Sequence, residues 1–279
     1  MYALPQLPDD RRPLPIGIFD SGIGGLTVAR ALAQALPNED FVYFGDTAHM
    51  PYGEKSVAAL QAYSIKITEM LLKQPCKAIV IACNTASATA YELVREYVGT
   101  RALVANVIEP TVAYLAGTFA GKRVGLIGTR QTVQTNAYLR RLQDQGATVE
   151  LHSLATPLLA AMIEEGFYAN NVSREAIHTY LSQPELEGIE ALVLACTHYP
   201  LIKPQIEAFY QGQAVEVLDC SVLVARRVAQ ALGQHLLLNP KQTPGTFRFF
   251  VSDYTRSFEA SSRLFFGQEV HLELYPLWR

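Results

Sequence analysis

The segment AIVIACNTASATAY (78–91) has the pattern of a buried strand that ends at a cysteine and leads into a helix. Its first five residues are apolar, Cys83-Asn84-Thr85 follow, and the rest is rich in alanine and serine. A continuous apolar run of this length is typical of a strand that is covered on both faces of a parallel sheet. Ligands bind at the carboxyl ends of such strands, so Cys83 stands where a site would form.

A second segment of the chain repeats this pattern. KAIVIACNT (77–85) aligns with EALVLACTH (190–198), and each copy ends in a cysteine followed by small hydrogen-bonding residues. IGIFDS (16–21) aligns in the same order with VGLIGT (124–129). The chain therefore reads as two copies of one α/β unit. If the copies face each other about a pseudo-twofold axis, one thiol lies on each side of a shared cleft.

Apolar runs of strand length alternate with amphipathic stretches between these motifs and beyond them. We predict strands at 16–19, 41–44, 78–82, 103–108, 123–128, 148–151, 191–195 and 215–218, and helices at 26–36, 57–71, 131–144 and 173–182, with Asp219 or Ser221 capping a further helix. The fold class is α/β, with two pseudo-twofold-related α/β domains, largely parallel sheets and the active site between them. We assign 1–108 plus 219–279 to the first domain, including the N-terminal tail 1–14 and the C-terminal segment, and 109–218 to the second.

Composition narrows the class of protein. The chain has 279 residues, is 49% hydrophobic and carries a net charge of −3, which fits a globular enzyme and leaves no electrostatic footprint for nucleic acid. We find no signal-peptide pattern and no apolar run long enough to cross a membrane, so we expect a cytoplasmic protein with no membrane partner. The four cysteines show no paired spacing, so we expect neither disulfides nor a metal site.

Two opposed thiols suit one kind of chemistry. A base on one face of a carbon acid removes the proton, and an acid on the other face returns one, so the configuration inverts. The roles swap in the reverse direction, and a thiol can fill both because its pKa lies near neutrality. Cys83 and Cys196 therefore suggest a two-base racemase or epimerase. The alternative for either residue alone is a small buried side chain, and we interpret Cys76 and Cys220 in that way.

Other polar residues follow the predicted strands. Asp20 and Ser21 open the glycine-rich loop after the first strand, where the alternative is a tight turn at a helix entry. Residues 51–53, Pro-Tyr-Gly, lie in the long loop after the second strand and either face the cleft or form a turn. His198 follows Cys196 by two residues and could orient or acidify its thiol. Glu164 could assist the same thiol or remain a solvated surface carboxylate.

Five motifs in this order resemble the glutamate racemases, which belong to the cofactor-independent aspartate/glutamate racemase superfamily. The motifs are IGIFDSGIGGLTV, VYFGDTAHMPYGEKS, IACNTASA, IGTRQTV and LACTHYPLI. The resemblance runs from about residue 15 to the C-terminus. One departure precedes Glu164, where the chain reads ATPLLAAMIEEG and Thr156 replaces the cysteine that is common in the family.

The resemblance implies roles for these residues. Cys83 would be the base for D-glutamate, with Asp20 assisting it, and Cys196 the base for L-glutamate, with Glu164 and His198 assisting it. We predict substrate contacts from Asp20, Ser21, Pro51, Tyr52, Gly53, Asn84, Thr85, Thr129, Thr197 and His198. No cofactor and no metal are expected. The resemblance also implies a homodimer that supplies D-glutamate for peptidoglycan synthesis and cell shape.

Three alternatives stay open at this point. An aspartate racemase would share the paired cysteines, although FDSGIGGL and DTAHMPYG favour glutamate. A non-catalytic amino-acid-binding protein could use the same scaffold, but both cysteines and their polar neighbours are intact. A pyridoxal-phosphate racemase would need a Schiff-base lysine, and Lys55, Lys66 and Lys77 stand in no such context.

Overall fold

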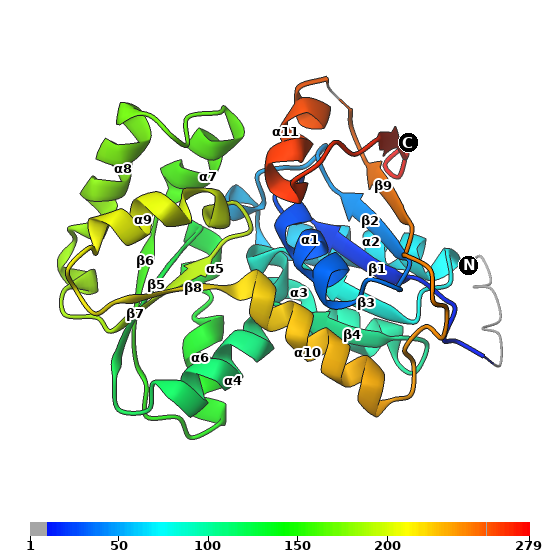
Figure 1. The fold of residues 1–279 in the computed structure, drawn as a ribbon, viewed down its shortest axis with the longest axis horizontal. Coiled ribbons are helices and arrows are strands. Elements are labelled where there is room, and N and C mark those ends of the chain that lie inside the picture. The colour runs from blue at the N-terminus through cyan, green and yellow to red at the C-terminus, as the bar shows by residue number, and fades with distance from the viewer. Residues whose placement is uncertain (1–9, 255) are drawn as a thin grey trace.

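The structure, a computed structural model, describes residues 10–254 and 256–279 of the chain. Residues 1–9, which form most of the N-terminal tail predicted at 1–14, lie outside the described residues. The described chain forms two lobes, each built on its own sheet, and the first described residues and the C-terminal residues both lie on the first lobe (Figure 1).

Every strand pairing in the two sheets is parallel, as the continuous apolar runs predict. The first sheet has the order β10-β9-β2-β1-β3-β4, with β1 (Ile16–Asp20), β2 (Phe41–Gly45), β3 (Ala78–Ile81), β4 (Leu103–Asn106), β9 (Phe247–Val251) and β10 (Leu272–Leu274). The second has the order β6-β5-β7-β8, with β5 (Arg123–Gly128), β6 (Glu150–Ala155), β7 (Ala191–Ala195) and β8 (Glu216–Asp219). No described strand belongs to both sheets, and the division of the chain into domains at residues 108 and 219 stays a prediction.

Helices connect and cover these strands. They are α1 (Leu26–Ala35), α2 (Val57–Lys73), α3 (Asn84–Val98), α4 (Ile108–Thr118), α5 (Arg130–Gln134), α6 (Ala137–Asp144), α7 (Pro157–Glu164), α8 (Asn171–Leu181), α9 (Lys203–Phe209), α10 (Cys220–Gln234) and α11 (Arg256–Phe266), with short 3₁₀ helices η1 (Tyr52–Glu54), η2 (Pro184–Leu186) and η3 (Tyr199–Ile202).

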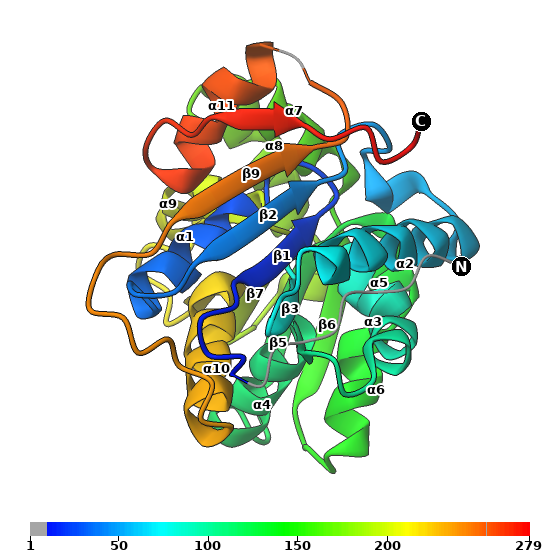
Figure 2. The same ribbon diagram turned by 90° about the vertical axis from the view of Figure 1, so that its right-hand side faces the viewer.

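The first sheet is buried on both faces. Ile16 and Ile18 of β1 point to the core under α1 and α10, whereas Phe19 points to the core under α2 and α3. Figure 2 shows α2 and α3 on one side of this sheet and α1 and α10 on the other. This two-sided burial explains why β1 is apolar at consecutive positions rather than at alternate ones.

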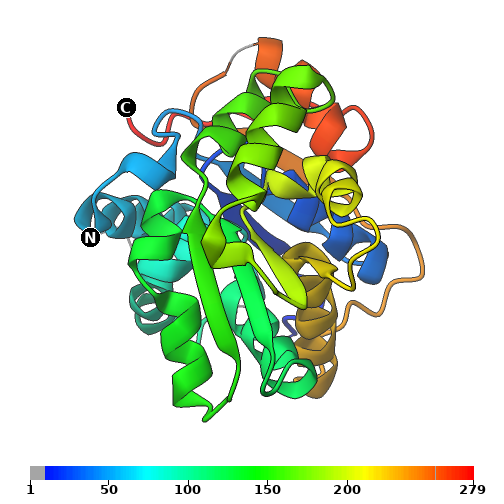
Figure 3. The same cartoon turned by 90° about the vertical axis from the view of Figure 1, so that its left-hand side faces the viewer.

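The second lobe repeats the arrangement on a smaller scale, and Figure 3 shows its strands with helices on both sides. Helix α10 ties the lobes together, because it follows β8 of the second sheet and packs against α1 of the first lobe and α4 of the second. Asp219 caps α10 by accepting a 2.8 Å hydrogen bond from the backbone N–H of Ser221, so of the two predicted capping residues Asp219 is the one that acts.

The structure departs from the predicted elements at three places. The strand predicted over 103–108 ends at Asn106, because its side chain accepts hydrogen bonds of 2.8 Å from the N–H groups of Ile108 and Glu109 and so starts α4. The helix predicted over 131–144 is two helices, α5 and α6, separated by Asn136 at a φ of 51°. The strand predicted at 148–151 is shifted to β6, and α7 follows it where no helix was predicted.

Candidate active site

A small cavity lies between the lobes, where the carboxyl ends of strands from both sheets meet. It is lined by Ser21, Pro51, Tyr52, Gly53, Cys83, Asn84, Thr85, Thr129, Ala160, Glu164, Ala195, Cys196, Thr197 and His198. The structure thus brings together every predicted site residue except Asp20, which is fully buried and does not line the cavity. Ala160 and Ala195 were not predicted, because an apolar residue of this size carries no chemical signal in a sequence.

Cys83 lies at the start of α3, on the side of the first lobe. Its Sγ accepts a 3.5 Å hydrogen bond from the backbone N–H of Ala86, and only 5% of the residue is exposed. Burial, followed by the nearby charge of Asp20, raises the pKa of the Cys83 thiol to about 12, although the Ala86 N–H and the Ser21 hydroxyl act in the opposite direction. Cys83 is therefore a protonated thiol near neutral pH.

Asp20 ends β1 and is held by the glycine-rich loop that follows. Its Oδ2 accepts hydrogen bonds from the N–H groups of Gly22 at 3.1 Å and Gly25 at 2.9 Å. Burial raises the pKa of the Asp20 carboxyl, and the hydrogen bonds and His198 only partly offset this effect. A negative Asp20 raises the pKa of the Cys83 thiol rather than lowering it, so this carboxyl does not favour a thiolate at Cys83.

Cys196, at the end of β7, has different neighbours. Its Sγ lies 3.7 Å from Nδ1 of His198, and Nε2 of His198 lies 2.7 Å from Oε1 of Glu164. Burial lowers the pKa of His198, but hydrogen bonds and charge from Cys196 and Glu164 outweigh it and raise this pKa well above its usual value. A cationic imidazole therefore lies beside the sulfur of Cys196.

The histidine ring is tightly enclosed. The edge of the Phe265 ring from α11 packs against it at a centroid distance of 5.3 Å and an interplanar angle of 83°. On another side, a β-carbon placed on Gly24 would lie 2.4 Å from Cε1 of His198. Only a residue without a side chain fits at position 24, so the glycine-rich loop leaves space for the histidine of the opposite lobe.

Hydrogen bonds across the cavity hold the lobes together. The hydroxyl groups of Thr85 and Thr129 lie 2.9 Å apart, and the Tyr138 hydroxyl donates to Oδ1 of Asn84 at 2.6 Å. Thr27 donates to the backbone carbonyl of Thr197 at 3.0 Å. The cavity is narrow, with a volume of about 30 Å³. In the described conformation it is too narrow for an amino acid, so the cavity must widen when a substrate binds.

The site can carry out proton transfer on both sides of a bound carbon acid. One thiol lies on each side of the cavity; Cys83 is protonated, and Cys196 faces a histidine cation. Hydroxyl and amide groups of Ser21, Asn84, Thr85, Thr129 and Thr197 surround them, and none of the lining residues is lysine or arginine. Carboxylate groups of a substrate would be held by neutral donors.

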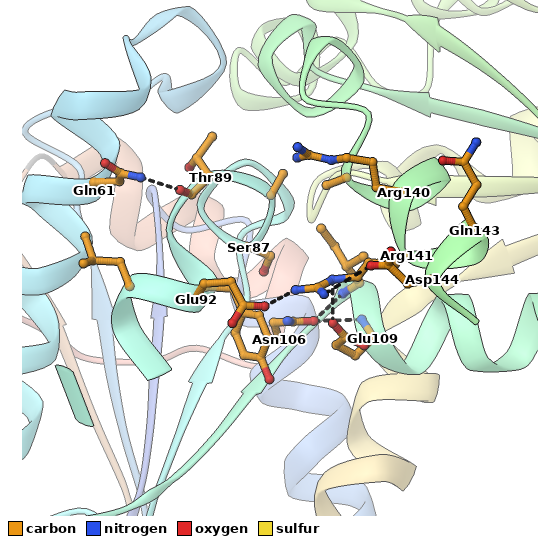
Figure 4. Close-up of a pocket in the computed structure, with 15 residues that line it drawn as sticks. Gln61, Ser87, Thr89, Glu92, Asn106, Glu109, Arg140, Arg141, Gln143 and Asp144 are labelled. Atoms are coloured by element: carbon orange, nitrogen blue, oxygen red, sulfur yellow. Dashed lines mark hydrogen bonds and ion pairs between the residues drawn. The ribbon is translucent and has the colours of Figure 1, made fainter. Parts of the chain in front are cut away.

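A larger cavity of about 530 Å³ lies elsewhere on the junction of the lobes, between α3, α4 and α6 (Figure 4). Arg141 of α6 reaches into it and pairs with Glu92 of α3, with Glu109 of α4 at 3.0 Å and with Asp144 at 3.6 Å. This cavity contains no cysteine or histidine among its lining residues, so it lacks the pair of thiols found in the smaller cavity.

Residues 10–254 and 256–279 lack two features. Within them, no helix is long and apolar enough to cross a membrane. Nor do these residues contain a group of three or more His, Cys, Asp or Glu side chains arranged to hold a metal ion. All four cysteines are buried and free.

Two α/β lobes that enclose a pair of thiols with these neighbours define an amino-acid racemase. The chain belongs to the Asp/Glu/Hydantoin racemase family, whose model matches residues 16–228. It is 39% identical to the glutamate racemase of Neisseria meningitidis over 93% of this chain and 95% of that one, and 41% identical to that of Geobacter metallireducens over 91% and 93%. The crystal structure of glutamate racemase from Francisella tularensis in complex with D-glutamate is similar to it, with a TM-score of 0.87, 37% identity and coverage of 96% of this chain and 99% of that one.

Proposed function

We propose that this protein interconverts L- and D-glutamate without a cofactor, by a two-base mechanism that uses Cys83 and Cys196. The observation that supports the mechanism most directly is the presence of both thiols, one from each lobe, on a single narrow cavity. The choice of glutamate is supported by the names of the relatives in Neisseria, Geobacter and Francisella, the last of which binds D-glutamate.

In the L-to-D direction, the thiolate of Cys196 removes the α-proton of L-glutamate, and the thiol of Cys83 delivers its own proton to the opposite face of the α-carbon. The Cα–H bond breaks, a new Cα–H bond forms, and the two sulfur atoms exchange protonation states. The D-to-L direction starts from the other arrangement, with the proton on Cys196 and the thiolate at Cys83. His198 and Glu164 assist Cys196, because the imidazole cation stabilises the thiolate.

Asp20 is proposed to assist Cys83 from a buried position that does not line the cavity. Its negative charge raises the pKa of the thiol, so its contribution is to keep the proton on Cys83 and to make the thiolate, once formed, a stronger base. The substrate carboxylates are proposed to bind the hydroxyl and amide groups of the cavity wall together with nearby backbone N–H groups, and Pro51, Tyr52 and Gly53 to close over the substrate.

The resemblance to glutamate racemases supports a wider proposal for the cellular role. D-glutamate made by this enzyme would enter peptidoglycan synthesis, which takes place on precursors in the cytoplasm. A homodimer and a cytoplasmic location are part of the same proposal, and sedimentation of the purified protein measures the first of these directly.

The deciding experiment incubates the purified protein, free of metal and cofactor, with L-glutamate or L-aspartate in heavy water. Optical rotation and α-deuteration are followed together. We expect glutamate to lose rotation while it gains one α-deuterium, and aspartate to do neither. Loss of optical rotation without α-deuteration would contradict the proposed mechanism, because a thiol that exchanges its proton with heavy water must deliver deuterium to the α-carbon. Racemisation of aspartate instead of glutamate would show that the enzyme is an aspartate racemase.

A further inference from the structure

Asp46, directly after β2, is a buried carboxylate outside the cavity that accepts hydrogen bonds from four different side chains. The Tyr52 hydroxyl donates to its Oδ2 at 2.7 Å. The Ser252 hydroxyl and the indole N–H of Trp278 donate to its Oδ1 at 2.7 Å and 2.8 Å, and Nδ1 of His49 lies 3.0 Å from Oδ2. Asp46 itself is fully buried, so hydrogen bonds from these donors take the place of the water that would otherwise solvate its carboxyl group.

These donors come from two distant parts of the chain. His49 and Tyr52 belong to the loop between β2 and α2, and Tyr52 is a wall of the cavity. Ser252 and Trp278 belong to the C-terminal segment, and Trp278 is the only tryptophan and the penultimate residue of the chain. Asp46 therefore links the C-terminus of the chain to the substrate loop, which we define as residues 45–54.

Further contacts join the same two segments. Thr47 donates to the backbone carbonyl of Asp253 and accepts from its N–H at 2.9 Å, and the Ser252 hydroxyl accepts from the N–H of Ala48 at 2.9 Å. The His49 ring lies edge-on to Trp278 with centroids 4.5 Å apart.

The other side of the His49 ring is also covered. It stacks on Tyr63 of α2, with ring centroids 4.1 Å apart and an interplanar angle of 17°. Tyr63 in turn contacts Trp278, with centroids 5.4 Å apart. The substrate loop is thus fixed between α2 and the C-terminal residues.

We propose that Asp46 is a positioning residue for Tyr52 and the substrate loop, and that the indole N–H of Trp278 completes this function from the far end of the chain. The proposal rests on the proposed racemase function, because it concerns the affinity of the same cavity. Asp46 touches neither thiol and lines no part of the cavity, so it acts only through Tyr52.

Oδ1 of Asp46 lies within hydrogen-bond distance of Ser252, of Trp278 and, at 3.1 Å, of Nδ1 of His49. The loss of the indole N–H leaves this buried oxygen with Ser252 and with His49, which Oδ2 shares at 3.0 Å. The loop then shifts to recover a donor or water, and the Tyr52 hydroxyl moves with it. Tyr52 is buried and lines the cavity, so a shift of its ring changes the shape of the cavity wall that contacts the substrate.

The test compares Trp278→Phe, which keeps an aromatic ring beside His49 but removes the N–H donor, with Tyr275→Leu. Tyr275 lies in the same C-terminal segment and packs on Phe44 and Phe250, with no hydrogen bond to Asp46. We expect Trp278→Phe to raise KM about three- to tenfold for both glutamate enantiomers, with kcat changed by less than about twofold. Tyr275→Leu lowers thermal stability and leaves KM at the wild-type value.

A second readout does not depend on activity. Hydrogen–deuterium exchange, followed by mass spectrometry on the full chain, should become faster in the substrate loop of Trp278→Phe and remain unchanged there in Tyr275→Leu. Unchanged exchange in the loop of Trp278→Phe would overturn the proposal, as would an equal rise in KM for both variants. A wild-type protein that racemises no glutamate would refute the proposed function instead, and the exchange measurement would still decide the link between Trp278 and the loop.

Discussion

Glu164 holds the Nε2 side of the His198 ring at 2.7 Å, and this contact leaves Nδ1 facing the Cys196 sulfur at 3.7 Å. The carboxylate belongs to α7, and the other two residues follow β7. Through this arrangement the carboxylate at one end of the imidazole stabilises a proton on the ring, and the charged ring faces the Cys196 sulfur at its other end. Cys83 has no histidine in this position and is held in its protonated form.

Glu164→Gln keeps the size of the side chain but removes the charge that stabilises the His198 cation. We expect kcat/KM to fall about ten- to a hundredfold, equally for both enantiomers. The matched control is Glu165→Gln, because Glu165 is the next residue, is exposed and does not line the cavity. Steady-state polarimetry measures both variants. A wild-type kcat/KM for Glu164→Gln would show that the carboxylate is only a surface group.

Replacement of either thiol by a hydroxyl removes one of the two acid/base groups. Cys83→Ser and Cys196→Ser should each abolish racemisation, while each variant should retain exchange of the α-proton for one enantiomer only. Under the proposed roles, Cys196→Ser retains exchange with D-glutamate and Cys83→Ser retains it with L-glutamate. Proton NMR in heavy water detects this washout. Wild-type racemisation by either variant would refute the two-thiol mechanism.

The pH profile of kcat/KM should lack a descending limb at alkaline pH. The pKa of Cys83 is raised to about 12, so this thiol keeps its proton through pH 10, and the pKa of His198 is raised well above its usual value. The productive state of the L-to-D reaction needs a protonated Cys83, and deprotonation of this thiol therefore causes no loss of activity below that pH. We expect kcat/KM to rise from acidic pH and then to stay level. The two enantiomers must give the same pH profile of kcat/KM, because the equilibrium constant between them is unity. A fall in kcat/KM between pH 8 and pH 10 would contradict a Cys83 thiol whose pKa is raised to about 12.

The space at Gly24 gives a steric prediction. In Gly24→Ala the new methyl group would lie 2.4 Å from Cε1 and 2.6 Å from Nδ1 of His198, so the histidine or its loop must move. A displacement of this kind costs about a hundredfold in kcat/KM. Gly117→Ala is the control, since nothing lies within 4 Å of its added methyl group, and alanine in a helix should raise stability by about 0.5–1 kcal/mol. Activity assays and thermal melts of both variants test the pair.

A buried ion pair lies at the amino ends of β2 and β3, away from the cavity, and we expect it to affect the stability of the protein but not its activity. Lys77 and Glu39 pair at 0% and 2% side-chain exposure, and Lys77 also donates to the backbone carbonyl of Arg12 at 2.6 Å. Glu39→Gln leaves the lysine charge without its partner and should cost about 3–5 kcal/mol of unfolding free energy. The half-exposed pair of Lys122 and Glu190 provides the comparison: Glu190→Gln should cost less than about 1 kcal/mol in urea denaturation.

Much of the fold could be predicted because strand patterning is local. The apolar runs that contain Ile16–Asp20, Ala78–Ile81 and Ala191–Ala195 are each short, continuous and followed by a polar turn, and all three are strands of parallel sheets. Helix α4 was missed because its apolar residues continue those of β4, and only the cap from the Asn106 side chain separates the two elements. A side-chain cap of this kind leaves no periodic signal in the sequence.

The residues of the cavity could be proposed from the repeat and from the resemblance, since strand ends collect at one edge of a sheet. Their roles stay a prediction. Asp46 and Trp278 escaped sequence analysis for a different reason: they are 232 positions apart, and their contact depends on how β9 and the C-terminal segment return to the first sheet. Long-range pairs of this kind follow from the tertiary arrangement rather than from any local pattern.

The cavity of about 30 Å³ has a consequence for every measured affinity. A protein whose cavity is too narrow for its substrate binds that substrate only during the fraction of time in which the cavity is wide enough, and the apparent dissociation constant is the intrinsic one divided by that fraction. Weak binding of glutamate therefore need not mean poor contacts. Substitutions that loosen the threonine contacts between the lobes would tighten apparent binding while they slow proton transfer, so affinity and turnover would move in opposite directions.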